Sequence, residues 1–150
     1  MDINLILVLI QSLTSIIALV SILILYRTIK SNEDINQRTI FNEVVKQERE
    51  LRIKLSEYRE EIHKRQKKSK DKENFIEITL DYDTLLFNYY EYLAICVNQR
   101  LINEKETKLY FKDLLIEVKD RFENSLLFKE RYAEKSQYKV LQWLFKKWEV

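Results

Sequence analysis

The sequence contains no glycine and no proline, and it has only one cysteine and one histidine among its 150 residues. Phosphate-cradling loops, dinucleotide-binding turns and tight hairpins need glycine, because only a residue without Cβ lets the backbone approach so closely. Cys96 alone excludes a disulfide within the chain, and Cys96 with His63 supplies too few ligands for a catalytic zinc site. The composition therefore predicts an all-α, non-enzymatic protein without cofactor or metal.

A long apolar run lies near the N-terminus. Residues 3–25 include no charged side chain, and seventeen of these twenty-three residues are apolar. As a helix they would measure roughly 35 Å, enough to cross a bilayer. Asp2 precedes the run whereas Arg27, Lys30 and Arg38 follow it. We therefore expect a transmembrane anchor over residues 1–26 of a single-pass inner-membrane protein, with its N-terminus outside, a cytoplasmic C-terminal domain and membrane lipid as a partner.

Polar and small side chains gather on one side of this predicted helix. At about 100° per residue they fall on or beside one stripe, opposite a face of isoleucine and leucine. A buried amide needs a partner, so the stripe should face protein or water. Two interpretations stay open, association of membrane helices and the lining of a pore. The stripe consists of Asn4, Gln11, Thr14, Ser15, Ala18 and Ser21.

Residues 27–66 contain no helix breaker and are predicted to form a long juxtamembrane helix. Apolar residues recur there at spacings of three and four, which indicates either the first helix of a globular domain or a coiled coil. A basic linker is expected over residues 67–75, and its charge favours a solvated loop over contact with lipid or RNA. The predicted helix seam consists of Phe41, Val44, Leu51, Leu55, Tyr58 and Ile62, with Glu48 between them.

Residues 76–150 are predicted to complete a cytoplasmic bundle of four to five helices. Alternation over residues 75–82 indicates an extended segment that leads into a helix, with Asp83 near the helix start. Asn103, followed three residues later by Glu106, is typical of a capping box. Asn124 and Ser125 interrupt the next run, and Ser136 is expected to cap the last helix.

Few side chains suggest chemistry. Glu91 lies among tyrosines, and we interpret it as a possible buried polar site, either a structural salt bridge or a ligand-sensing carboxylate. Cys96 lies on an apolar helix face and should act as a small hydrophobe. Arg59 precedes His63 by one helical turn, which is typical of a solvated surface pair.

Part of the sequence resembles a known family. The resemblance covers roughly residues 80–150 and lies in residues 86–94, residues 101–105, Tyr110 with Phe111, and residues 138–141 with Leu144 and Trp148. This part looks like a group of small prokaryotic single-pass membrane proteins with a cytoplasmic helical domain of unknown function. The whole layout is also similar to the membrane accessory protein of type VI-B CRISPR systems, which implies a HEPN-like bundle, a pore and phage defence. Its ribonuclease relatives carry an Arg-to-His motif that is not met at His63.

We therefore predict a self-assembling, membrane-anchored protein that forms homo-oligomers, with pore formation in antiviral defence as the finer reading. The alternative is a monomeric adaptor that recruits a cytoplasmic protein partner to the membrane. An RNA-binding HEPN-like module is a further alternative, although a net charge of only +2 argues against nucleic acid as a partner.

Overall fold

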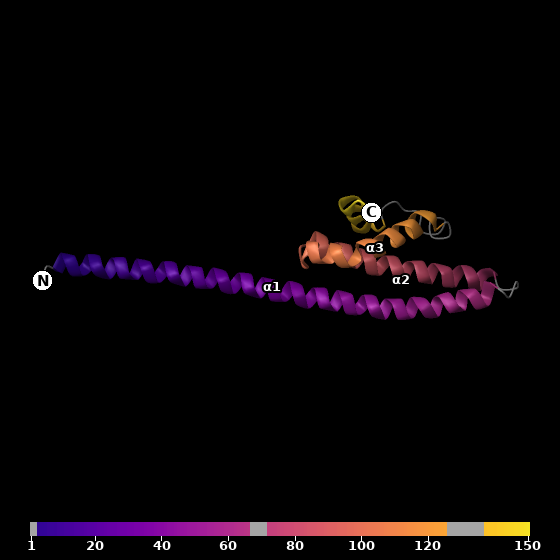
Figure 1. Cartoon of the computed structure of the whole chain (residues 1–150), viewed down its shortest axis with the longest axis horizontal. Helices are drawn as coiled ribbons and strands as arrows, with labels where there is room; N and C mark the ends of the chain where they lie inside the picture. The colour runs from indigo at the N-terminus through magenta and orange to yellow at the C-terminus, as the bar shows by residue number, and fades with distance from the viewer. Residues whose placement is uncertain (1–2, 67–71, 126–136) are drawn as a thin grey trace. The chain divides into compact units, whose positions relative to one another are not determined.

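The computed structural model describes residues 3–66, 72–125 and 137–150, with side chains given for 16–65, 75–125 and 137–150. Within these ranges all regular structure is helical and no strand occurs, so the all-α prediction is confirmed. The helices are α1 (Ile3–Gln66), α2 (Lys72–Asn98), α3 (Glu104–Asn124) and α5 (Lys139–Trp148), as Figure 1 shows. The basic linker and the predicted cap Ser136 fall largely or wholly outside the described residues.

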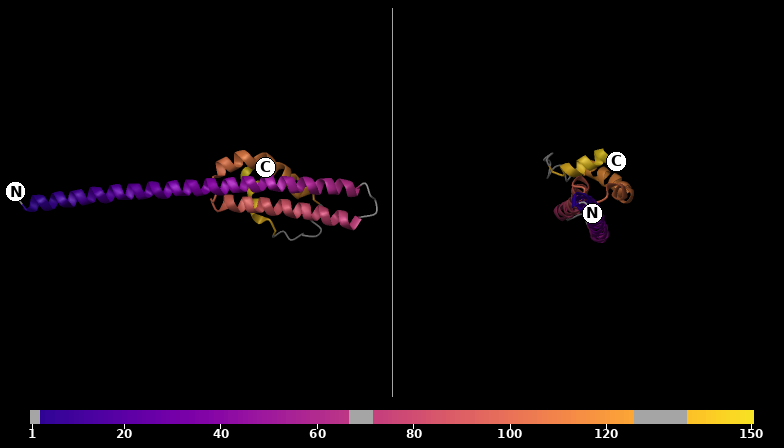
Figure 2. Two further views of the ribbon diagram at one scale, coloured as in Figure 1. Left: turned by 90° about the horizontal axis from the view of Figure 1, so that it is seen from below. Right: turned by 90° about the vertical axis from the view of Figure 1, so that its left-hand side faces the viewer.

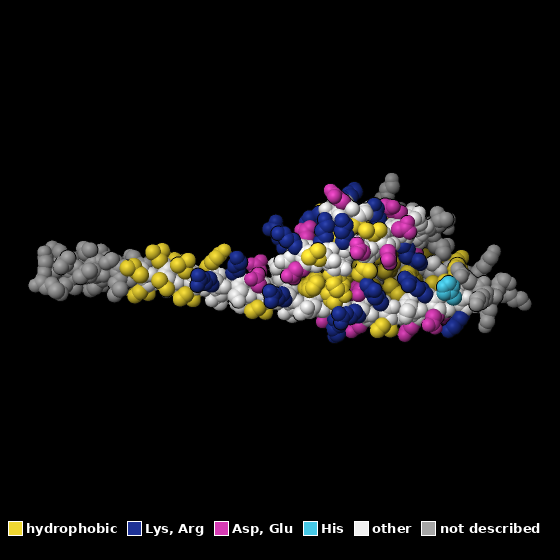
Figure 3. Space-filling model, in the orientation of Figure 1, with side chains coloured by type: hydrophobic (Ala, Val, Ile, Leu, Met, Phe, Trp, Pro, Cys, Tyr) yellow, Lys and Arg dark blue, Asp and Glu magenta, His cyan; other side chains and the backbone are white. Residues whose placement is uncertain are grey.

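The chain divides into two units, Met1–Gln37 and Arg38–Val150. The first unit contains the N-terminal part of α1. Its described side chains from Ile16 to Tyr26 are all exposed, and they cover every direction around the helix because successive residues are about 100° apart. Figure 3 shows hydrophobic side chains along this part of the chain. We call residues 16–26 the apolar segment.

The predicted membrane anchor is wrong. No helix in the described part of the chain is both long and apolar enough to cross a membrane. The fold class is therefore corrected to an all-helical chain without a transmembrane helix in its described part, and the predicted single-pass localisation in the inner membrane is overturned with it.

The second unit is built around α2. This helix packs against α3 and α5, and Figures 1 and 2 show it running back alongside the second half of α1. The apolar faces of all four helices meet in one core, because each helix buries one stripe and leaves the other solvated. The largest fully buried side chains come from all four of these helices, and they include Val44, Phe87, Leu93, Phe111, Leu115, Leu141 and Trp148.

The predicted helix seam of α1 faces this core. Val44, Leu51 and Leu55 are buried. The remaining members, Phe41, Tyr58 and Ile62, are half-buried against the same cluster. A long-range hydrogen bond fixes the two helices, since the Tyr89 hydroxyl of α2 donates to the backbone carbonyl of Val44 at 2.8 Å.

The helix boundaries confirm one local signal and correct another. Asn103 is the N-cap of α3, and its side chain accepts hydrogen bonds from the backbone N–H groups of Lys105 and Glu106. Residues 75–82 are not extended, because α2 already begins at Lys72. Asp83 therefore lies in the body of α2, fully buried, and cannot cap its start.

Candidate functional site

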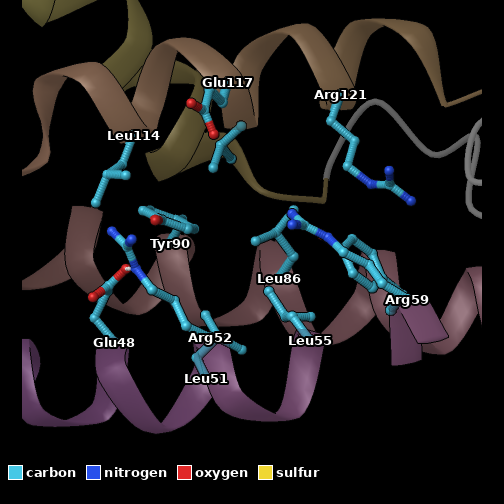
Figure 4. Close-up of a pocket in the computed structure, with 12 residues that line it drawn as sticks. Glu48, Leu51, Arg52, Leu55, Arg59, Leu86, Tyr90, Leu114, Glu117 and Arg121 are labelled. Atoms are coloured by element: carbon cyan, nitrogen blue, oxygen red, sulfur yellow. Dashed lines mark hydrogen bonds and ion pairs between the residues drawn. The ribbon is translucent and has the colours of Figure 1, made fainter. Parts of the chain in front are cut away.

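Two adjoining cavities open between α1, α2 and α3 in the second unit. The first has a volume of about 250 Å³, and Figure 4 shows its lining side chains. Tyr82, Leu86 and Tyr90 of α2 line it together with residues of α1 and α3. The second cavity, of about 260 Å³, shares Arg59, Tyr82 and Arg121 with the first. We call the two cavities together the arginine groove, because Arg52, Arg59 and Arg121 all line it.

Helical spacing places these cations along the groove. Arg52 and Arg59 are seven residues apart on α1, close to two full turns, so they lie on the same face of the helix. That face borders the core stripe of Leu51 and Leu55, which positions the arginines at the rim of the core. Arg121 enters from α3 one turn after Glu117.

At one end of the groove the charges are paired. Glu48 is only 2% exposed and forms an ion pair with Arg52, one turn along α1. The hydrogen bond to Glu48 raises the pKa of the Arg52 guanidinium. A buried carboxylate without a cation would cost several kcal/mol, so Arg52 is committed to Glu48.

Arg121 is paired as well. Its Nε donates to a carboxylate oxygen of Asp83, and the Ser125 hydroxyl donates to the other oxygen. Asp83 is fully buried, whereas the Arg121 side chain is 39% exposed and reaches from the core to the groove. The guanidinium carbon of Arg121 also lies 4.2 Å from the centre of the Tyr82 ring, a cation–π distance.

Arg59 differs from the other two arginines. Its Nε and Nη2 donate to the Tyr82 hydroxyl at 3.1 and 2.9 Å. A phenol is neutral, and within the described part of the chain no carboxylate forms an ion pair with Arg59. The two hydrogen bonds to Tyr82 fix the orientation of the Arg59 guanidinium beside the groove.

Two buried tyrosines of α2, Tyr82 and Tyr90, line the groove. Burial raises the pKa of Tyr90, which lines the first cavity, and of its neighbour Tyr89. Both phenols therefore stay protonated at neutral pH and can donate hydrogen bonds.

Glu91 lies outside this groove. It is half-buried, and its carboxylate accepts hydrogen bonds from the backbone N–H groups of Val140 at 3.3 Å and Leu141 at 2.6 Å. The N-cap residue of α5, Tyr138, has left-handed backbone geometry and provides no side-chain cap. Glu91 of α2 thus supplies the cap that Tyr138 does not, through backbone N–H groups of α5.

The other predicted site residues are scattered. The side chains of Asn4, Gln11, Thr14 and Ser15 lie outside those described. Ala18 and Ser21 are exposed, and the Ser21 hydroxyl donates to the carbonyl of Ile17 in its own helix at 2.8 Å. Because this bond satisfies the hydroxyl locally, Ser21 needs no partner from another helix.

The remaining titratable candidates stay apart from one another. Cys96 is fully buried, and burial raises the pKa of its thiol. His63 is exposed and lines the second cavity with Arg59. The described residues contain no cluster of three or more His, Cys, Asp or Glu side chains that could hold a metal ion.

Comparison with known proteins identifies the family. A family model described as a domain of unknown function (DUF4760) matches residues 9–148. The chain belongs to the DUF4760 family. This confirms the predicted likeness to a family of unknown function, and the DUF4760 match extends well beyond the C-terminal half on which that likeness rested. No curated protein and no solved structure matches the chain, so the comparisons show no link to CRISPR systems.

Sequence reasoning about this DUF4760 chain missed most of the arginine groove. Tyr82 and Arg121 are separated by about forty positions and meet only in the folded unit. Arg59 was noticed but interpreted as solvated surface. The available signal was its position seven residues after Arg52, which put two cations along one edge of an apolar stripe.

Proposed function

We propose that this protein is a non-enzymatic, self-assembling helical protein whose copies associate through the apolar segment of α1. The observation that carries the proposal is the exposure of this segment. Its large aliphatic side chains are between 49% and 63% exposed, and they point in all directions around the helix. Helices that are apolar all round are normally buried.

A second copy of the chain is the occupant that best fits this surface. A single partner helix would cover only one side, whereas several identical helices cover all sides of one another. Burying one such side chain contributes about 1.5 to 3 kcal/mol, so a few contacts per copy are sufficient for association. Between Ile16 and Tyr26 there is no charge, and copies can therefore align without repulsion.

Charges just beyond the segment support a packed arrangement of copies. Arg27 and Lys30 are followed within one or two turns by Glu33 and Asp34, and all four are exposed. In neighbouring parallel helices, opposite charges at this spacing can pair across the interface, as they do in coiled coils. The segment would then be flanked by a ring of ion pairs that favours the aligned register.

The test measures the oligomeric state of the full chain in detergent-free buffer. We expect sedimentation to show oligomers whose population rises with protein concentration. The double variant Leu19→Glu with Leu23→Glu should be monomeric, because assembly would bury unpaired carboxylates. Leu109→Glu is the matched control, since Leu109 is 88% exposed on α3 and lies outside the segment.

Two outcomes would overturn the proposal. One is a wild-type chain that stays monomeric at every concentration. The other is an equal loss of assembly in the Leu109→Glu control, which would locate the interface in the second unit. Far-UV circular dichroism of each variant verifies that the helices remain formed.

Pore formation and recruitment to a membrane both required the predicted transmembrane anchor, so neither is part of this proposal. A part in phage defence stays a prediction from architectural resemblance. The proposal is limited to assembly.

A further inference from the structure

We propose that the arginine groove binds a small phosphate monoester, with Arg59 as its anchoring cation. The site lies entirely within the second unit and does not involve the apolar segment, so it is independent of self-assembly. Three features of the groove carry the proposal: its charge, its donors and its size.

The charge is positive where the two cavities meet. Arg59, Arg121 and His63 line the second cavity, and no carboxylate is among its described lining residues. Arg121 is offset by the buried Asp83, whereas the hydrogen bonds of Arg59 to described side chains go to the Tyr82 hydroxyl. The second cavity is therefore the positive part of the groove, whereas the first cavity is also lined by the carboxylates Glu48 and Glu117. A positive cavity with low-dielectric walls concentrates anions.

The hydrogen-bond donors suit a phosphate group. Tyr82 accepts two bonds from Arg59, which leaves its own hydroxyl proton able to donate. Arg59 retains N–H groups beyond those two, and the Nη groups of Arg121 are not those bound to Asp83. The guanidinium carbons of Arg59 and Arg121 lie 5.8 and 4.2 Å from the same ring centre. Guanidinium forks recognise the acceptor-only oxygens of phosphate better than other cations do.

The size and the lining favour a small ligand. Cavities of about 250 and 260 Å³ are at the lower end of known ligand sites. Ile62 and Phe75 provide an apolar side in the second cavity. A phosphate on the arginines with a compact ring against Phe75 would use both parts, which points to a monoester rather than free phosphate.

Calorimetric titration of the full chain with phenyl phosphate tests the proposal, with inorganic phosphate and acetate as comparison probes at equal ionic strength. We expect phenyl phosphate to bind more tightly than phosphate, acetate not to bind, and added salt to weaken both phosphate probes. Arg59→Gln should weaken phenyl phosphate binding about tenfold, since a hydrogen-bonded charge pair is lost. Arg49→Gln replaces an exposed arginine of the same helix and should leave the affinity unchanged.

Tyr82→Phe is the second variant, because it keeps the ring under Arg121 and removes only the hydroxyl that orients Arg59. It should weaken binding as well. The proposal is overturned if wild-type protein binds neither phosphate probe, or if Arg59→Gln and Arg49→Gln have equal effects. It is also overturned if a single-stranded oligonucleotide binds in an Arg59-dependent manner while phenyl phosphate does not, which would make the groove a nucleic-acid contact.

Discussion

The carboxylate of Glu91 in α2 caps α5 by accepting the backbone N–H of Leu141 at 2.6 Å. Because Tyr138 offers no side-chain cap, this contact between residues fifty positions apart satisfies the start of a ten-residue helix. A helix this short is not stable alone, so it depends on tertiary contacts.

Replacement of Glu91 should therefore loosen α5. We expect Glu91→Gln to lower the free energy of unfolding by about 1 kcal/mol, since one amide oxygen cannot replace a charged carboxylate at the positive end of the helix. Urea titration monitored by fluorescence measures the change. Glu77→Gln, at an exposed site on the same helix, is the control and should have little effect. Equal stability of both variants would argue against the cap.

Breaking the pair between Asp83 and Arg121 should be more costly. Asp83 is fully buried and accepts hydrogen bonds from Arg121 and Ser125. Removal of one partner of a buried pair costs about 3 to 5 kcal/mol. We therefore expect the loss of unfolding free energy in Asp83→Asn to approach that range. Chemical unfolding of Asp83→Asn, Arg121→Gln and the double variant gives the coupling energy. Additive effects of the two single changes would contradict the pairing.

The contact between Glu104 and Lys147 should make the free energy of unfolding depend on pH. The hydrogen bond from Lys147, at 2.7 Å, is the main reason why the pKa of Glu104 lies below its ordinary value of 4.5. A carboxylate with a depressed pKa contributes stability that is fully present above pH 4.5 and is lost as the pH falls through the folded pKa. Both side chains are partly exposed, so the contribution should stay below about 1 kcal/mol.

Lys147→Gln should accordingly be less stable than wild type at pH 7, and the difference should shrink as the pH falls below 4.5. Urea midpoints measured across this range give the comparison. Lys146→Gln changes the neighbouring exposed lysine and should show no such pH dependence. A constant difference between Lys147→Gln and wild type at all pH values would contradict the assignment.

The single thiol should be unreactive in the folded chain. Cys96 is fully buried, and burial raises the pKa of the thiol, which lowers the fraction of reactive thiolate. We expect Ellman's reagent to label Cys96 only after denaturation, at least tenfold more slowly than it labels a cysteine introduced at the exposed Lys54. Rapid labelling of the native wild-type chain would show that the core around α2 opens readily.

Local signals in the sequence proved more informative than distant ones. The cap Asn103 was predictable because its partners, Lys105 and Glu106, are two and three residues away. The alternation over residues 75–82 was misleading. Ile76, Leu80 and Asp83 are also spaced by four and three, so the same pattern fits one face of a helix.

The arginine groove could not be assembled from the sequence. The contact of Arg59 with Tyr82 joins residues 23 positions apart, and that of Asp83 with Arg121 joins residues 38 apart. Neither spacing follows from helical periodicity, because each depends on how the helices pack. The prediction of a transmembrane anchor was wrong for another reason. The apolar composition of residues 3–25 predicted a membrane span, whereas no helix in the described part of the chain is long and apolar enough to cross a membrane.

Both tryptophans of the chain, Trp143 and Trp148, lie on α5. Trp148 is almost fully buried, and its indole N–H donates to Glu104 at 3.1 Å, while Trp143 is half-buried beneath the ammonium group of Lys147. The intrinsic tryptophan fluorescence of this protein therefore reports on α5 and on its packing against α3. An optical signal recorded without any label will register the detachment of α5, even when the longer helices stay folded.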